Sequence, residues 1–157
     1  MSSPSSPASE PAEEAPRFPT GVLPAIRRVM VPQDTNAMGS IFGGAILAEI
    51  DLAAAIGSRR HHSGKVVTVA MDKVEFRQPV FVGDVMTIFS DTRRIGRTSI
   101  TLHVTVWAER RMCQGSPELV TEAEVTMVAV DDDFKPIPIE KPLLTSTDDP
   151  AGPKHDS

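Results

Sequence analysis

The feature that most constrains this chain of 157 residues is a helix-forming segment that is apolar on nearly every side. From Gly43 the sequence runs GGAILAEIDLAAAIG, which is rich in Ala, Leu and Ile, residues with good helix propensity. Only Glu49 and Asp51 interrupt it. A helix that is apolar all round must be enclosed by other structure. We therefore predict a buried helix that ends near Gly57, where the basic residues that follow suit a helix C-terminus.

Four long strand-like segments follow this helix in the sequence. Alternation of apolar and polar residues predicts strands at 65–76, 85–95, 98–110 and 118–131, with a phase slip before Val74. A shorter β-like segment at 22–31 and a loop at 32–40 precede the helix. A curved antiparallel sheet of about five strands, wrapped around one long central helix, would bury both partners. The expected fold class is therefore α+β.

The prolines mark the limits of the folded part. Of 14 prolines, five lie in residues 1–19 and five in residues 136–157. The N-terminal stretch is built mainly from Ser, Pro, Ala and Glu, and the last dozen residues are similarly polar. Such segments are too poor in apolar groups to offset the entropy lost on ordering. We expect disordered tails at 1–19 and 141–157, flanking a single domain at 20–140.

Charge and composition exclude several classes of function. Residues 21–135 carry 13 basic and 14 acidic side chains, so a general affinity for nucleic acid is not expected. No apolar run approaches the roughly 20 residues that span a bilayer, and the N-terminus resembles no secretory signal. A cytoplasmic location is expected. Cys113 is the single cysteine, and no Cys/His spacing resembles a zinc site, so no metal site is predicted.

Asp51 is the first candidate for a functional residue. It lies in the middle of the predicted helix, and its neighbours three and four positions away are small or apolar: Leu47, Ala48, Ala54 and Ala55. An ionised carboxylate on such a face is costly unless it is paired or placed at the opening of a site. On the pattern alone, an exposed stripe shared with Glu49 is an equally good reading.

Gly43 and Gly44 are the second candidates, because they stand at the start of the same helix. The first backbone N–H groups of a helix have no partner within it, and they carry partial positive charge. Glycine would let a ligand approach these donors, which suit an oxygen that gains negative charge during acyl transfer. The alternative is that both glycines only permit a tight turn and close contact with the sheet.

The order of several motifs gives a more specific indication. The runs DTNAMGSIFGGAILAEID, VVTVAMDKVEFRQPVFVGD, IGRTSI, VTVWAE and VAVDDDFKPIPI resemble the hot-dog-fold acyl-CoA thioesterases of the YciA type. The cytosolic long-chain acyl-CoA hydrolases belong to the same broader group. The resemblance extends from about Val22 to Ile139, which is essentially the whole folded part. It implies a single hot-dog domain that hydrolyses acyl-CoA thioesters to a free acid and CoA.

The resemblance also assigns roles to individual residues. It implies that Asp51 is the catalytic carboxylate, acting either as general base for water or as nucleophile through an anhydride. Gly43 and Gly44 would supply the oxyanion donors, and Asn36 could hydrogen-bond near the thioester. Ser40 stands where the family usually has Asp, Asn or Thr. No cofactor is required, because CoA is part of the substrate.

The spacing of these residues predicts an oligomer. Gly43 and Asp51 are eight residues apart, or about 12 Å along one helix at roughly 1.5 Å per residue. One thioester carbon cannot contact both. If both act, the site must combine Asp51 of one subunit with Gly43 and Gly44 of another, as in an isologous homodimer with antiparallel helices. Family resemblance further implies a trimer of dimers.

A basic turn is the candidate CoA-binding element. It offers two kinds of group for phosphates, guanidinium groups and the hydroxyls or amides beside a glycine, and its residues are Arg93, Arg94, Gly96, Arg97, Thr98 and Ser99. The alternative is a solvated hairpin tip, although IGRTSI matches a family motif. Arg110 and Arg111 form a second basic pair with a weaker claim.

Other readings of the chain have less support. Hydratases of the same fold generally use a histidine with a carboxylate, and no histidine lies beside the loop and helix start. His61 and His62 diverge at a helix end, and Cys113 has no base motif nearby. A non-catalytic acyl-CoA sensor remains the alternative function, against which the presence of Asp51 argues. The acyl chain length and any regulation by nucleotides or CoA stay open.

Overall fold

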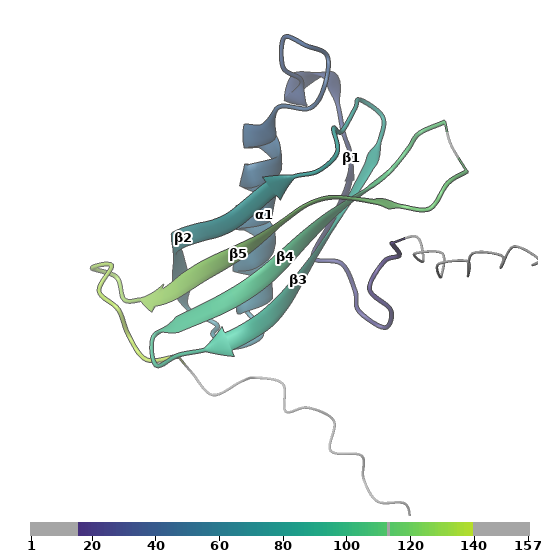
Figure 1. Cartoon of the computed structure of the whole chain (residues 1–157). Helices are drawn as coiled ribbons and strands as arrows, with labels where there is room; N and C mark the ends of the chain where they lie inside the picture. Colours follow the sequence, from purple (N-terminus) through teal and green to yellow (C-terminus); the bar gives the residue numbers. More distant parts are fainter. Residues whose placement is uncertain (1–15, 113, 140–157) are drawn as a thin grey trace, which may run out of the picture.

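The structure is a computed structural model that describes residues 16–112 and 114–139. Most of the expected N-terminal tail, all of the expected C-terminal tail and Cys113 lie outside the described residues. Figure 1 shows one helix, α1, lying against one face of a twisted sheet whose strands cross it obliquely. The expected α+β architecture, a single hot-dog domain, is confirmed.

Five antiparallel strands form one sheet in the order β1-β3-β4-β5-β2. The strands are β1 (Ile26–Val29), β2 (Lys65–Phe76), β3 (Val85–Ile95), β4 (Ser99–Glu109) and β5 (Glu118–Val130). A short 3-10 helix, η1 (Pro32–Asp34), and the helix α1 (Gly43–Ser58) lie between β1 and β2. Strand β1 is shorter than the segment 22–31 from which it was predicted, and β2 forms the opposite edge of the sheet.

The core lies between α1 and the sheet. Strand β4 turns Leu102, Val104 and Val106 towards the helix, and all three are fully buried. The helix contributes Ile46, Ile50, Ala53 and Ala54 to the same cluster. This confirms the prediction that an all-round apolar helix must be enclosed, and burial of the apolar side chains on both elements is the main force that holds them together.

The helix ends at Ser58, so Gly57 lies inside its last turn and does not terminate it. A Cβ atom on Gly57 would clash with the Ser90 hydroxyl and would lie 2.7 Å from a methyl carbon of Leu102. Glycine is therefore needed here for close packing of helix against sheet.

Two bulges break the regular alternation of β2. Its pairing with β5 shifts register between Thr68 and Ala70 and again between Asp72 and Glu75. The second shift confirms the phase slip expected before Val74, and Lys73 adopts a positive φ of 56° within it. Between the two bulges the strand keeps Met71 packed against the core. The bulges bend the edge strand along the helix.

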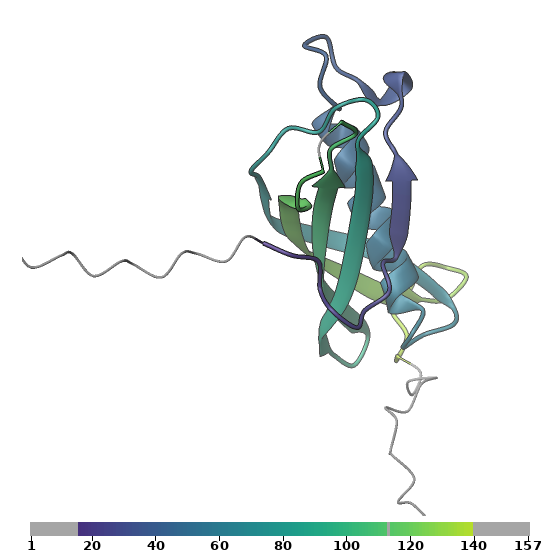
Figure 2. The ribbon, with the colours of Figure 1, turned by 90° about the vertical axis from the view of Figure 1, so that its right-hand side faces the viewer.

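The sheet face away from α1 is covered in part by the N-terminal segment (Figure 2). Phe18 packs on Phe89 and Trp107, with ring centroids 5.5 and 5.8 Å apart. The contacts of the domain therefore extend back to Phe18. The rest of this face is charged: Lys73 pairs with Glu124, Arg77 pairs with Glu122, and His103 lies 3.3 Å from Glu122.

Candidate active site

The start of α1 lies beside an open pocket. Gly43 is the first helical residue and follows Phe42, whose carbonyl accepts from the amides of Ala45 and Ile46. The amides of Gly43 and Gly44 precede the first intrahelical hydrogen bonds. A pocket of about 290 Å³ opens beside Gly43, and the Phe76 ring at the end of β2 forms one wall. This arrangement can accept an oxygen that carries negative charge.

Backbone hydrogen bonds from two other segments hold this helix start. The Phe42 amide donates to the Asp34 carbonyl at 2.7 Å, and the Ile41 amide donates to the Val80 carbonyl at 2.7 Å. Ile41 also forms an isolated bridge with Thr35. The residues directly before Gly43 are therefore held by two segments, one that contains Asp34 and one that contains Val80.

Asp51 is half-buried and faces β2. The hydroxyl of Thr68 donates a hydrogen bond to Oδ1 of Asp51 and also lies 3.1 Å from the sulfur of Met127. Beyond Asp51, a second pocket of about 530 Å³ lies between the last turns of α1 and the start of β2. Leu52 and Ile56 line it and are 52% and 40% exposed. An apolar, uncovered helix face thus borders the carboxylate.

Glu49 does not share an exposed stripe with Asp51, so the Glu49 part of the alternative reading is wrong. Residues two apart on a helix point in nearly opposite directions. Glu49 accepts a hydrogen bond from Arg28 of β1, and its side chain is only 14% exposed. Arg28 also pairs with Asp34, and the hydrogen bond to Glu49 is the main cause that raises the pKa of Arg28.

Asn36 organises the loop in front of the helix. Its Oδ1 accepts from the amides of Met38 and Ser40 at 2.9 and 3.2 Å, and its Nδ2 donates to the Ser40 hydroxyl at 2.9 Å. These bonds also give Ser40 a role, because its hydroxyl closes the loop. An amide nitrogen carries two hydrogens, so Asn36 keeps a second donor for a ligand.

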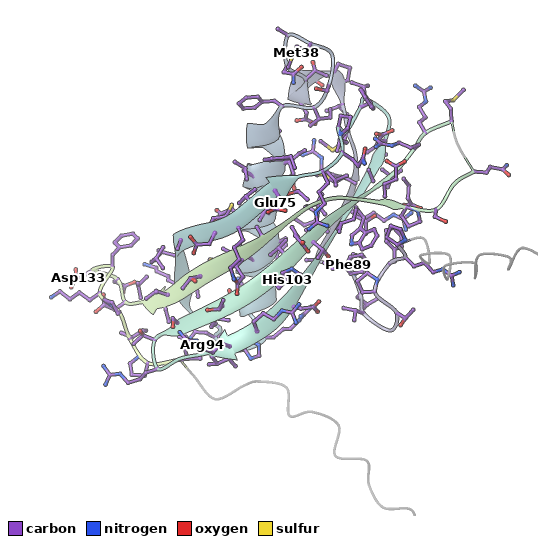
Figure 3. All side chains as sticks on the ribbon, in the orientation of Figure 1. Met38, Glu75, Phe89, Arg94, His103 and Asp133 are labelled. Atoms are coloured by element: carbon purple, nitrogen blue, oxygen red, sulfur yellow. The ribbon has the colours of Figure 1, made fainter. Side chains whose placement is uncertain are left out.

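The basic turn lies at the other end of the protomer from Gly43. Figure 3 shows Arg94 at the end of the sheet opposite the loop that carries Met38. The residues directly after α1 contact this end, since Arg60 donates to the Ser90 carbonyl at 3.0 Å and His61 lies 2.7 Å from the Thr92 hydroxyl. Gly43, Asp51 and the basic turn are thus spread along one helix and do not meet within one chain.

Within the turn, side chains and backbone have different roles. Arg93, Arg94 and Arg97 are all exposed, and Arg93 also contacts the ring of His103 at 2.9 Å. The Gly96 amide closes the turn on the Ser99 carbonyl at 2.7 Å. The carbonyls of Arg97 and Thr98 accept from the amides of Ile139 and Ala129. The backbone of the turn is held by these hydrogen bonds, while Arg94 and Arg97 are exposed.

The two arginines of the second basic pair, Arg110 and Arg111, have different surroundings. Arg110 donates to the buried carboxylate of Asp84 at 2.6 Å, to Glu118 at 3.1 Å and to the Pro79 carbonyl at 2.8 Å. Burial opposes the charge of Arg110, but its hydrogen bonds to Glu118 and Asp84 outweigh burial and raise its pKa. Arg110 therefore ties the 79–84 loop to β4 and β5, while Arg111 is exposed.

The histidines at the end of α1 have protein partners rather than a ligand set. His61 faces Thr92, and burial, with the charge of Arg60, lowers the pKa of His61. His62 is buried.

Among residues 16–112 and 114–139, no group of three or more metal-ligating side chains comes together. Over the same residues, no helix has the length and apolar character needed to cross a membrane.

Thr68 and Arg28 are the site-related residues that the sequence pattern did not indicate. Thr68 stands in an apolar alternating strand, and its contact with Asp51 depends on how β2 lies along the helix. Arg28 lies more than twenty residues from Glu49 in the sequence. The sequence feature that could have indicated Thr68 is a polar residue on the side of the strand that faces the helix.

Comparisons with known proteins place this chain in a family. Residues 38–113 match the thioesterase superfamily. The YciA acyl-CoA thioester hydrolase of Salmonella typhimurium is 38% identical over 123 residues, which cover 77% of this chain and 92% of that protein.

Two solved structures are similar in both fold and sequence. A hexameric hotdog-fold thioesterase of Campylobacter jejuni has 47% identity and a TM-score of 0.71, over 74% of this chain and 90% of that chain. An acyl-CoA hydrolase from Staphylococcus aureus, in complex with butyryl coenzyme A and coenzyme A, has 31% identity and a TM-score of 0.67, over 74% of this chain and 70% of that chain.

Fold, site and matches define a hot-dog-fold thioesterase. Within that class, the chain belongs to the family of YciA-type acyl-CoA thioester hydrolases. The family resemblance expected from the sequence motifs is therefore confirmed.

Proposed function

We propose that this protein hydrolyses acyl-CoA thioesters to the free carboxylic acid and CoA, at a site built from two subunits. The observation that carries the proposal is that both halves of the site lie along the same edge strand. Phe76 of β2 lies beside Gly43, and Thr68 of β2 lies beside Asp51. In the described chain β2 pairs only with β5, so its other edge is free for a partner.

A two-fold axis at this edge would bring the two halves together. The midpoint between Gly43 and Asp51 is Leu47, and the midpoint between Thr68 and Phe76 is Asp72. An axis that passes near Leu47 and Asp72 would place Asp51 of one subunit opposite the partner's helix start, with helices antiparallel. The exposed Leu52 and Ile56 would then be covered by the second subunit. Two equivalent sites result.

The chemistry requires only water and the thioester. As general base, Asp51 would take a proton from water while the water oxygen attacks the carbonyl carbon. The oxyanion would be stabilised by the helix-start amides of the partner, the C–S bond would break, and Asp51 would return the proton to the thiolate of CoA. As nucleophile, Asp51 would attack the carbonyl carbon and break the C–S bond, so that the CoA thiolate leaves and takes a proton from water, and water would then hydrolyse the anhydride to the free acid and the Asp51 carboxylate. Both routes place the same demand on Thr68, which orients the carboxylate.

The basic turn is the proposed phosphate site. In a pair of antiparallel helices, the C-terminal end of one helix lies near the start of the other. The exposed Arg94 and Arg97 would therefore stand at the same end as the partner's Gly43, and guanidinium groups suit the phosphates of CoA. Arg93, Thr98 and Ser99 would complete the turn. Asn36 would contribute its free donor near the thioester.

The assembly of dimers into a trimer of dimers is part of the proposal, because similar thioesterases of known structure are hexameric. A cytoplasmic location and the lack of a required cofactor stay predictions. The alternative, a non-catalytic acyl-CoA sensor, would bind the same ligand without turnover.

The decisive experiment is release of free thiol from a panel of acyl-CoAs by wild type and Asp51→Asn. The proposal expects the wild type to release CoA and the Asn variant to bind acyl-CoA without releasing it. Thiol release at equal rates from both proteins would refute the role of Asp51. Binding without release by both would favour the sensor.

A further inference from the structure

Three charged side chains join the start of α1 to its second turn. Arg28 of β1 reaches Glu49 with Nη1 and Asp34 with Nη2. The side chains of Arg28, Asp34 and Glu49 are 34%, 19% and 14% exposed, so the group is partly shielded from water. Ion pairs in such a position depend on their geometry more than pairs on an open surface do.

These contacts form a closed circuit with the helix. The backbone carbonyl of Asp34 accepts a hydrogen bond from the amide of Phe42, and Phe42 directly precedes Gly43. Arg28 holds Asp34 and is itself anchored on Glu49, which is part of the helix. Arg28 and Asp34, which lie outside the helix, thereby fix the helix start relative to the second turn of the same helix.

The circuit also balances charge close to the helix start. Two carboxylates face one guanidinium, and removal of Arg28 would leave Asp34 and Glu49 without that shared cation. Their repulsion would act on the segment that carries the Phe42 hydrogen bond. The predicted consequence is a shift of the Gly43 and Gly44 amides rather than loss of a ligand contact.

We propose that Arg28, Asp34 and Glu49 form a positioning clamp that sets the oxyanion donors of thioester hydrolysis. The inference rests on the proposed function and adds a requirement that neither Asp51 nor the glycines reveal. Arg28 is a positioning residue in this account, because it acts through Asp34 and Phe42. A displacement of a preorganised donor by even a fraction of an ångström weakens its effect on the transition state more than on the bound substrate.

The test compares Arg28→Met with Arg27→Met in steady-state kinetics of the full chain. Arg27 lies on the same strand and pairs with Glu109 at 2.7 Å on the surface, which makes it a matched control. We expect Arg28→Met to lower kcat about tenfold with KM changed less than about twofold, and Arg27→Met to change neither. If Arg28→Met fails to fold, Arg28→Lys replaces it, with an expected loss of about threefold, because an ammonium lacks the fork that spans two carboxylates.

A second background distinguishes positioning from general stability. Gly43→Pro removes one amide donor, so a clamp that acts through this donor has less left to position. Arg28→Met should then lower the residual kcat by less than about twofold. An equal tenfold loss in both backgrounds would overturn the clamp, as would a raised KM with unchanged kcat, which would indicate direct contact with substrate. Full turnover by Asp51→Asn would instead refute the proposed function, whereas an inactive Asp51→Asn beside a normal Arg28→Met overturns only the clamp.

Discussion

Thr68 donates a hydrogen bond through its hydroxyl to Oδ1 of Asp51, so the edge strand of the sheet holds the carboxylate of the buried helix. The contact occurs directly before the first bulge of β2, where pairing with β5 shifts register. Edge strand and helix are therefore linked at the residue proposed to carry the chemistry. A partner that pairs along β2 would act on the same contact.

The first prediction concerns this hydrogen bond. Thr68→Val keeps the shape of the side chain but removes the donor, and we expect kcat to fall about tenfold, the equivalent of about 1.4 kcal/mol. KM should change little, because the bond orients a reacting group. Thr68→Ser retains a hydroxyl and should recover most of the rate. Equal losses in the Val and Ser variants would show that the hydroxyl is not what matters.

The second prediction separates the amide of Gly43 from the space around it. Proline is well tolerated at the first helical position, and Phe42, at ψ 129°, already has the extended backbone that precedes proline. Gly43→Pro removes the N–H, and we expect kcat to fall by about 10²-fold or more. Gly43→Ala is the matched control, because its Cβ would meet the Phe76 ring at an ordinary 3.5 Å and the N–H remains. A similar loss in both variants, measured by thiol release, would contradict the oxyanion role.

The third prediction addresses CoA binding. Arg97 is exposed on the basic turn while its carbonyl is held by Ile139, so Arg97→Ala removes a charge without releasing the backbone. We expect KM for acyl-CoA to rise about fivefold, which corresponds to about 1 kcal/mol, with kcat nearly unchanged. The rise should shrink at high salt. An unaltered KM at low ionic strength would remove Arg97 from the site.

The fourth prediction concerns pH and stability. Burial, with the charge of Arg60, lowers the pKa of His61 below the 6.5 of the unfolded chain. Between the folded pKa and 6.5 the unfolded state binds more protons, so the contribution of His61 is present above 6.5 and is lost as the pH falls through the folded pKa. His61→Gln, which can keep a contact with Thr92, should flatten the fall in the free energy of unfolding between pH 7 and pH 5. If the free energy of unfolding, measured by urea denaturation, fell equally with pH in the two proteins, this prediction would be contradicted.

Sequence patterns predicted the fold to within a few residues but only part of the site. Periodicity located α1 and the four long strands because burial on one face leaves a mark every two residues in a strand, and an all-round apolar helix is unusual. The partners of Glu49 and Arg110 were missed, since ion pairs between distant segments depend on the register and twist of the sheet. The bulge before Ala70 was missed for the same reason, and with it the contact between Thr68 and Asp51.

The central claim is that each site takes Asp51 from one subunit and Gly43 from the other, and a mixing experiment tests it directly. Asp51→Asn and Gly43→Pro chains are each assembled alone, then unfolded together in equal amounts and refolded. Random pairing makes about half of the dimers mixed, and each mixed dimer contains one site with both an intact Asp51 and an intact Gly43.

The account predicts that the mixture recovers about one quarter of wild-type thiol release, although neither variant alone releases thiol at a comparable rate. If Asp51 and Gly43 of the same chain formed the site, no pairing would restore it. Activity of the mixture no greater than the average of the two separate variants would therefore contradict the shared site.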